Sequence, residues 1–156
     1  MRVRAAILLL GAMLTGTASA ASVAIGWSDL AHRDAAPAGL DGEMVTIRGF
    51  LLPVDREDDL VFEFLLVPWA GACSHVSQPP PDQVIRVTPS EPIRVAGSYE
   101  EVMVVGRLAS GSETTQLFIM DGVARVTSGY SLGQAQVERV GPAPADRANP
   151  WKSLTR

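Results

Sequence analysis

Residues 21–140 are predicted to form one all-β domain, a small closed or partly open β-barrel of the oligonucleotide/oligosaccharide-binding type. Two observations predict this fold. Short apolar runs recur along the chain and are separated by Gly, Pro and acidic residues, which is the pattern of short strands. Gly49 stands in the middle of the longest run, where a glycine lets a strand coil around a corner. Helical periodicity is weak everywhere except in Ile25–His32, where a turn or two of helix is expected.

The first two strands are predicted to form a hairpin. Met44–Val54 alternates between its two faces, and Gly49 within it suggests a bulge or a tight bend. Leu60–Val67 is apolar at nearly every position and is predicted to be buried on both faces. The acidic segment Asp55–Asp59 between them is expected to be the turn.

The remaining strands are shorter or less regular. Asp121-Gly122 is a hairpin-turn dipeptide and is expected to interrupt the chain there. The predicted strands are Val84–Val87, Ile93–Val95, Glu101–Leu108, Gln116–Val126 and Ala135–Val140. Gly141–Arg156 contains little apolar content and is predicted to be a loose, flexible tail.

Residues 1–20 have the three parts of a secretory signal peptide. Arg2 and Arg4 make a basic start, and the apolar run Ala5–Leu14 follows. Ala18 and Ala20 then occupy the two small positions before a cleavage point. An uncleaved anchor is the alternative, but the apolar run has about half of the roughly 20 residues that span a bilayer. We expect cleavage after Ala20 and a location in the periplasm.

The charge of the mature chain limits its partners. Thirteen basic residues less Arg2 and Arg4 leave eleven, against seventeen acidic ones, so the net charge is −6. Nucleic acids and anionic membrane surfaces favour clustered Lys and Arg, so neither is an expected partner. The most apolar later segment, 62–70, contains Glu63 and Pro68, and no membrane span is expected after signal cleavage.

The segment Val67–Gln83 is a connection of roughly 15 residues, longer than most loops and therefore a candidate for function. It contains Cys73, the only cysteine of the chain. Pro79–Pro81 is expected to hold the outgoing chain in an extended polyproline form. A single cysteine in an oxidising compartment is buried, joined to another molecule or used chemically.

Cys73 and His75 lie two residues apart, so in extended backbone their side chains share a face. A thiolate and an imidazole together suit zinc or copper, with further ligands from His32, from Asp82 or from a partner. Alternatively, His75 activates the thiol for redox or nucleophilic chemistry. A third interpretation is structural: Cys73 packs in the core, His75 caps the loop, and His32 is a solvated polar residue.

The same segment resembles the exported bacterial family of unknown function DUF3299. The resemblance runs from Trp27 to Val140 and is most specific in Gly71–His75 followed by Pro79–Gln83. Trp27–Leu30, Leu40–Pro53 and Glu63–Pro68 also match, whereas Ser74, Ser77, Gln78 and Asp82 depart from the expected loop. The resemblance implies an accessory protein encoded beside ATP-driven (ABC) transporters, some of them linked to zinc or other metals.

Three functions follow from these observations. The first is a periplasmic accessory protein that binds zinc or copper and is associated with periplasmic or inner-membrane components of an ABC transporter. The second is an interaction module of the cell envelope that needs no metal. The third is a thiol-dependent enzyme, and a binding role is favoured over catalysis.

Overall fold

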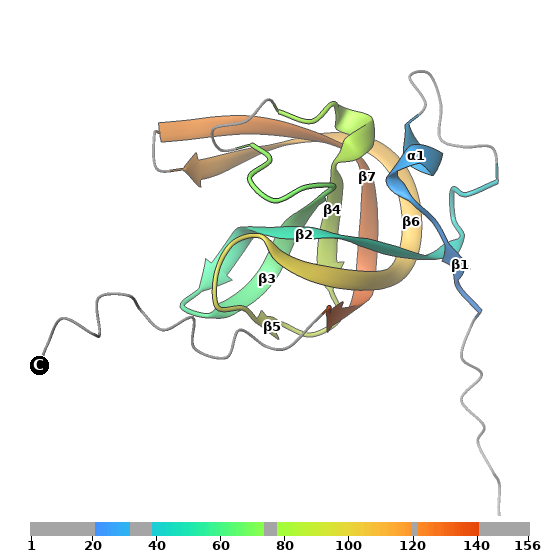
Figure 1. The fold of residues 1–156 in the computed structure, drawn as a ribbon, viewed down its shortest axis with the longest axis horizontal. Coiled ribbons are helices and arrows are strands. Elements are labelled where there is room, and N and C mark those ends of the chain that lie inside the picture. The colour runs from blue at the N-terminus through green and yellow to red at the C-terminus, as the bar shows by residue number, and fades with distance from the viewer. Residues whose placement is uncertain (1–20, 32–38, 74–77, 120–121, 141–156) are drawn as a thin grey trace, which may run out of the picture.

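The structure, a computed structural model, describes residues 21–31, 39–73, 78–119 and 122–140. Strands make up most of these ranges, with one short α-helix and one 3₁₀ turn (Figure 1). The elements are β1 (Val23–Ala24), α1 (Trp27–Leu30), β2 (Met44–Glu57), β3 (Leu60–Val67), η1 (Pro81–Gln83), β4 (Ile85–Pro89), β5 (Ile93–Arg94), β6 (Glu100–Ile119) and β7 (Gly122–Arg139). No helix in the described ranges has the length and apolar content needed to cross a membrane.

Five strands close into a ring. Going around it, β2 pairs with β6, β6 with β7, β7 with β4, β4 with β3, and β3 again with β2. Only the contact between β4 and β7 is parallel within the ring. Counted in chain order, the strands follow one another around the ring as first, second, third, fifth and fourth. The predicted all-β class is confirmed.

The β2–β3 hairpin forms as predicted, with β3 spanning Leu60–Val67. The turn is shorter than expected, because β2 continues through the acidic residues to Glu57. Register shifts near Asp55 let the strand keep pairing while these side chains reach solvent. The predicted burial of β3 on both faces is confirmed for Phe64–Val67. It is wrong for Phe62, which is 37% exposed.

The expectation of separate strands at Glu101–Leu108 and Gln116–Val126 is wrong. Both belong to one long hairpin, in which β6 runs to Ile119 and β7 begins at Gly122 and includes Ala135. β6 ends at Ile119 and β7 begins at Gly122, as the predicted break at Asp121-Gly122 requires, and residues 120–121 lie outside the described residues. No strand was predicted between Leu108 and Gln116, but β6 continues through Ser110-Gly-Ser112 with only a register shift, because β7 pairs on both sides of it.

The apolar side chains form two clusters. The inner cluster lies inside the ring, because all five ring strands contribute to it. Its large members on these strands include Ile47, Leu51, Phe64, Leu66, Ile85, Leu108, Tyr130 and Leu132. The outer cluster comprises Leu52, Leu65, Val67, Ala72, Cys73, Val84, Leu117 and Val126. Side chains alternate between the two faces of a strand. On β3, Phe64 and Leu66 face the inner cluster, whereas Leu65 and Val67 face the opposite way. The outer cluster therefore lies outside the ring.

Gly49 has a different role from the predicted bend. It pairs regularly with Val102 of β6, and the register shifts of β2 lie further along the strand. A Cβ at Gly49 would lie 2.8 Å from the carbonyl oxygen of Val67 and 2.9 Å from the ring of Trp27. The glycine is therefore needed for close approach of β3 and α1.

The N-terminal segment contains the expected single turn of helix. Trp27 of α1 donates from Nε1 to the carbonyl oxygen of Arg48 at 2.8 Å, and Leu30 is fully buried. Gln83 of η1 donates to the carbonyl oxygen of Trp27 at 2.9 Å, which joins α1 to the end of the β3–β4 loop. The predicted signal peptide (1–20) and tail (141–156) lie outside the described residues.

Candidate functional site

Cys73 lies at the end of the described first half of the β3–β4 loop. It is 6% exposed and belongs to the outer cluster, whose other buried members are all aliphatic. The backbone at Cys73 has φ of +69°, a conformation that few non-glycine residues adopt. The preceding residue is held from the other side, because the hydroxyl of Tyr99 donates to the carbonyl oxygen of Ala72. The loop thus places the thiol within the apolar outer cluster.

Burial raises the pKa of the Cys73 thiol above its ordinary value of 9.0. The thiolate is the form that attacks electrophiles and binds metals, and apolar surroundings disfavour it. These surroundings match the structural interpretation of Cys73 more closely than the reactive one.

The other predicted site residues are divided between described and undescribed segments. His75 and His32 lie outside the described residues. Asp82 is part of η1 and is half-buried; its Oδ1 atom is buried and has no hydrogen-bond partner among the described residues. Burial first, and the charge of Asp82 second, raise the pKa of Tyr130. Within the described part of the chain, no group of three His, Cys, Asp or Glu side chains is placed to hold a metal ion.

The extended conformation predicted for Pro79–Pro81 is seen at Pro80, which has φ of −64° and ψ of 158°. The chain then tightens into η1 at Pro81. This turn lies directly against β7, since a Cβ at Gly129 would be 2.7 Å from the carbonyl oxygen of Pro81.

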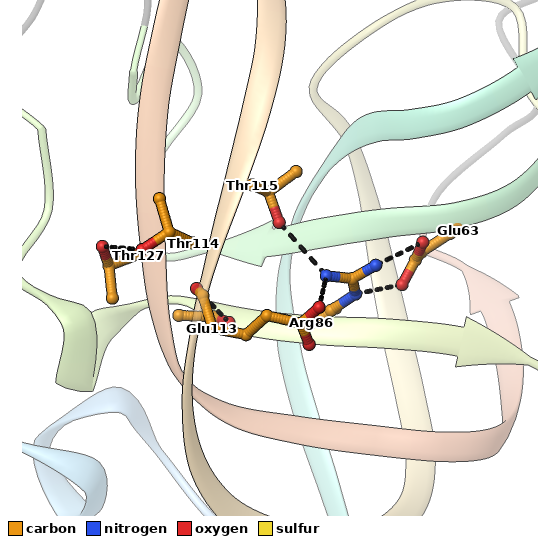
Figure 2. Close-up of polar contacts among 7 residues, drawn as sticks. Glu63, Arg86, Glu113, Thr114, Thr115 and Thr127 are labelled. Atoms are coloured by element: carbon orange, nitrogen blue, oxygen red, sulfur yellow. Dashed lines mark hydrogen bonds and ion pairs between the residues drawn. The ribbon is translucent and has the colours of Figure 1, made fainter.

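Figure 2 shows a polar cluster that was not predicted from the sequence, formed by side chains of β3, β4 and β6. Arg86 of β4 binds both carboxylate oxygens of Glu63 of β3, with Nη2 at 2.8 Å from Oε2. Its Nη1 contacts the carboxylate of Glu113 of β6 and lies 3.4 Å from Oγ1 of Thr115. We call Glu63, Arg86, Glu113 and Thr115 the Arg86 cluster.

The Arg86 cluster joins the far part of β6 to the outer face of β3 and β4. The side chains of Arg86 and Glu63 are 22% and 20% exposed, whereas that of Glu113 is 59% exposed. The hydrogen bonds to Glu63 raise the pKa of Arg86, so the guanidinium stays charged. A signal existed in the sequence: Glu63 and Arg86 each interrupt an apolar strand. Only the register that pairs Leu65 with Arg86 brings the two side chains together.

The end of the β6–β7 hairpin projects beyond the ring (Figure 1). Its inner face supplies Leu117 and Val126 to the outer cluster. Its outer face exposes Phe118 and Val123, which lie directly opposite each other and are 88% and 57% exposed. An exposed pair of large apolar side chains at the end of a hairpin is the kind of feature that marks a contact site.

The fold can now be compared with known proteins. The sequence pattern of a family described as "Protein of unknown function (DUF3299)" matches residues 13–139. The chain belongs to the DUF3299 family. The predicted resemblance is therefore confirmed at the level of the family.

One DUF3299 family protein, from Pseudomonas aeruginosa PAO1, has a crystal structure that is similar to this DUF3299 chain. The two share 24% sequence identity with a TM-score of 0.62, over 78% of this chain and 98% of that one. This likeness shows the fold. Among curated proteins, none matches the chain.

Proposed function

We propose that this DUF3299 protein is an exported interaction module, which binds another protein of the cell envelope through the end of its β6–β7 hairpin. The observation that carries the proposal is the cross-strand pair of Phe118 and Val123. Phe118 is the most exposed large apolar residue in the described part of the chain. Burying such a side chain against a partner contributes about 1.5–3 kcal/mol.

The attachment of the hairpin supports the proposal. Leu117 and Val126 pack beneath the exposed pair, and the Arg86 cluster ties the adjoining part of β6 to the ring. A contact site that is ordered before binding loses less conformational entropy when the partner arrives. The hairpin therefore presents Phe118 in a preformed position.

Export to the periplasm is part of the same proposal and rests on the signal-peptide pattern of residues 1–20. The resemblance noted above suggests a component of an ABC transporter as the partner. Intact mass spectrometry of the protein recovered from the periplasm should give a chain that begins at Ala21. A mass that retains residues 1–20 would contradict cleavage.

The interaction is tested with a photo-reactive phenylalanine analogue placed at position 118 in exporting cells. The matched control places it at Phe62, an exposed aromatic residue on β3. We expect one envelope protein to be cross-linked from position 118 and not from 62, and to bind purified wild-type protein but not Phe118→Ser. Equal labelling from both positions, or binding that survives Phe118→Ser, would overturn the proposal.

A metal site at the β3–β4 loop is a second candidate, because the buried Oδ1 of Asp82 has no partner among the described residues. In it Cys73 and His75 would bind zinc or copper(I), with Asp82 or His32 as further ligands. The raised pKa of Cys73 counts against it, and counts equally against a thiol-dependent enzyme.

Calorimetric titration of the mature protein with zinc and with copper(I) tests the metal candidate. Binding should be lost in Cys73→Ser and weakened in His75→Ala and Asp82→Asn, and it should release protons. Wild-type protein that binds neither metal more tightly than about micromolar, roughly −8 kcal/mol, would exclude it.

A further inference from the structure

The far half of β6 has an open edge. Residues 102–107 of β6 lie between β2 on one side and β7 on the other. Beyond them, Ser110 still donates its N–H to Oδ1 of Asp41 at 2.6 Å. From Glu113 to Ile119, β6 pairs only with β7, and no other described strand lies on its outer edge.

Two hydrogen bonds show which backbone groups point out of this edge. The side chain of Gln78, in the loop before β4, donates to the carbonyl oxygen of Arg125, as it can when this oxygen points away from β6. The cross-strand partner of Arg125 is Gln116. In an antiparallel ladder both members of such a pair direct their N–H and C=O groups outward. The backbone N–H and C=O groups of Gln116 therefore point away from β7.

The neighbouring residues follow the same alternation. Ser128 of β7 donates from Oγ to the carbonyl oxygen of Glu113 at 3.3 Å, so this carbonyl group points toward β7. Thr114, Gln116 and Phe118 then present their N–H and C=O groups to the open edge. Their side chains all lie on the exposed face of the hairpin.

This edge lacks the features that normally prevent strands from pairing. Proteins protect exposed edges with Lys, Pro, bulges or very short strands. The stretch 113–119 contains no Lys and no Pro, and its one charged side chain, Glu113, is bound to Arg86. The strands at the two ends of the sheet order, β1 and β5, have only two residues each.

We infer that the open edge of β6 pairs antiparallel with the same edge of a second copy of this chain, about a two-fold axis through Gln116. In this register Gln116 faces its own copy and Thr114 faces Phe118 of the other copy. Because the outward residues are uncharged, the pairing brings no like charges together despite the net negative charge of the protein. An isologous contact of this kind closes at two copies.

The dimer and the proposed function use the same hairpin, and Phe118 belongs to both: its backbone lies on the dimer edge, whereas its side chain carries the proposed contact. The dimer needs the backbone edge of β6, whereas Val123 lies on β7 and stays exposed in each copy. The two proposals are tested independently. The proposed function predicts a cross-link to another protein, whereas the dimer predicts a molecular mass of two chains.

Light scattering after size exclusion, run on the mature protein from low to high micromolar concentration, measures the dimer. Gln116→Pro removes an N–H that points outward and leaves the ladder to β7 intact. We expect it to weaken the dimer about tenfold or more, since both copies lose a hydrogen bond. Gln116→Ala keeps the N–H and is the matched control, which should dimerise like the wild type.

A charge exchange tests the two-fold register without relying on proline. Gln116→Lys and Gln116→Glu should each be monomeric, because like charges then face each other across the axis. Mixed in equal amounts, they should form a heterodimer. A wild-type protein that is monomeric at every concentration, including one that binds only unrelated extended peptides, would overturn the inference. So would a dimer that Gln116→Pro leaves unchanged, or a mixture that stays monomeric.

Discussion

Arg86 on β4 and Glu63 on β3 form a two-pronged ion pair on the outer face of the ring, with Nη2 of Arg86 2.8 Å from Oε2 of Glu63. The same guanidinium reaches Glu113 on the far half of β6. Arg86 is thus the one residue of this cluster that links three strands. It holds the far half of the hairpin over the apolar cluster that contains Cys73.

Arg86→Met should destabilise the protein by about 1–3 kcal/mol, because it leaves two carboxylates without their cation while partial exposure screens the loss. Chemical denaturation measures this change. The double variant Glu63→Met, Arg86→Met should recover about 1 kcal/mol of the summed single effects. The matched control is Arg94→Met, which breaks the exposed ion pair with Asp59 and should have little measurable effect. Equal effects of Arg86→Met and Arg94→Met would contradict the role of the Arg86 cluster.

Gly49→Ala should cost about 1–3 kcal/mol, since the added methyl group would meet the backbone of Val67 and the ring of Trp27. Gly49→Val should cost more, despite the high β propensity of valine. Gly133→Ala is the control, because a Cβ there meets nothing within 4 Å. Thermal melting of the three variants measures these stability changes. A Gly49→Ala protein with the melting temperature of the wild type would show that β3 and Trp27 do not approach Gly49 closely.

The buried thiol should make stability depend on alkaline pH. Burial raises the folded-state pKa of Cys73 above its ordinary 9.0, so the folded state holds this proton more tightly than the unfolded state does. The resulting stabilisation is fully present below about pH 9 and is lost as pH rises through the folded-state pKa. Melting temperatures of the wild type should therefore fall more steeply above pH 9 than those of Cys73→Ala. Tyr130, whose pKa is also raised, is common to both proteins. If the melting temperatures of the two proteins fell in parallel with pH, the Cys73 thiol would be exposed to solvent and the prediction would be wrong.

Phe118→Ser should leave the free energy of unfolding within about 0.5 kcal/mol of the wild type, because the side chain is 88% exposed. Leu117→Ser, one residue away, places a hydroxyl in the outer cluster and should cost about 2–4 kcal/mol. Denaturant titration of both variants compares the two faces of the hairpin. A large loss in Phe118→Ser would mean that Phe118 packs against the protein itself.

Several features of the fold follow from residues that are neighbours in the chain. The apolar run of Leu60–Val67 predicted β3 with its observed bounds, and Asp121-Gly122 predicted the break between β6, which ends at Ile119, and β7, which begins at Gly122. The helical turn at Trp27–Leu30 was also expected. Each of these signals is a period or a turn preference, which acts over a few residues and can be read without knowing the tertiary structure.

The sequence by itself therefore determined the all-β class, most strand positions and membership of the DUF3299 family. The tertiary structure alone decided that Ser110-Gly-Ser112 continues a strand, that the far hairpin folds back over β3, and that Arg86 meets Glu63 and Glu113. It also decided that Cys73 lies in an apolar cluster rather than on the surface. The physical reason is the same for each: these contacts depend on the register between strands that are distant in the chain, and a shift of one residue would turn every side chain of a strand to its other face.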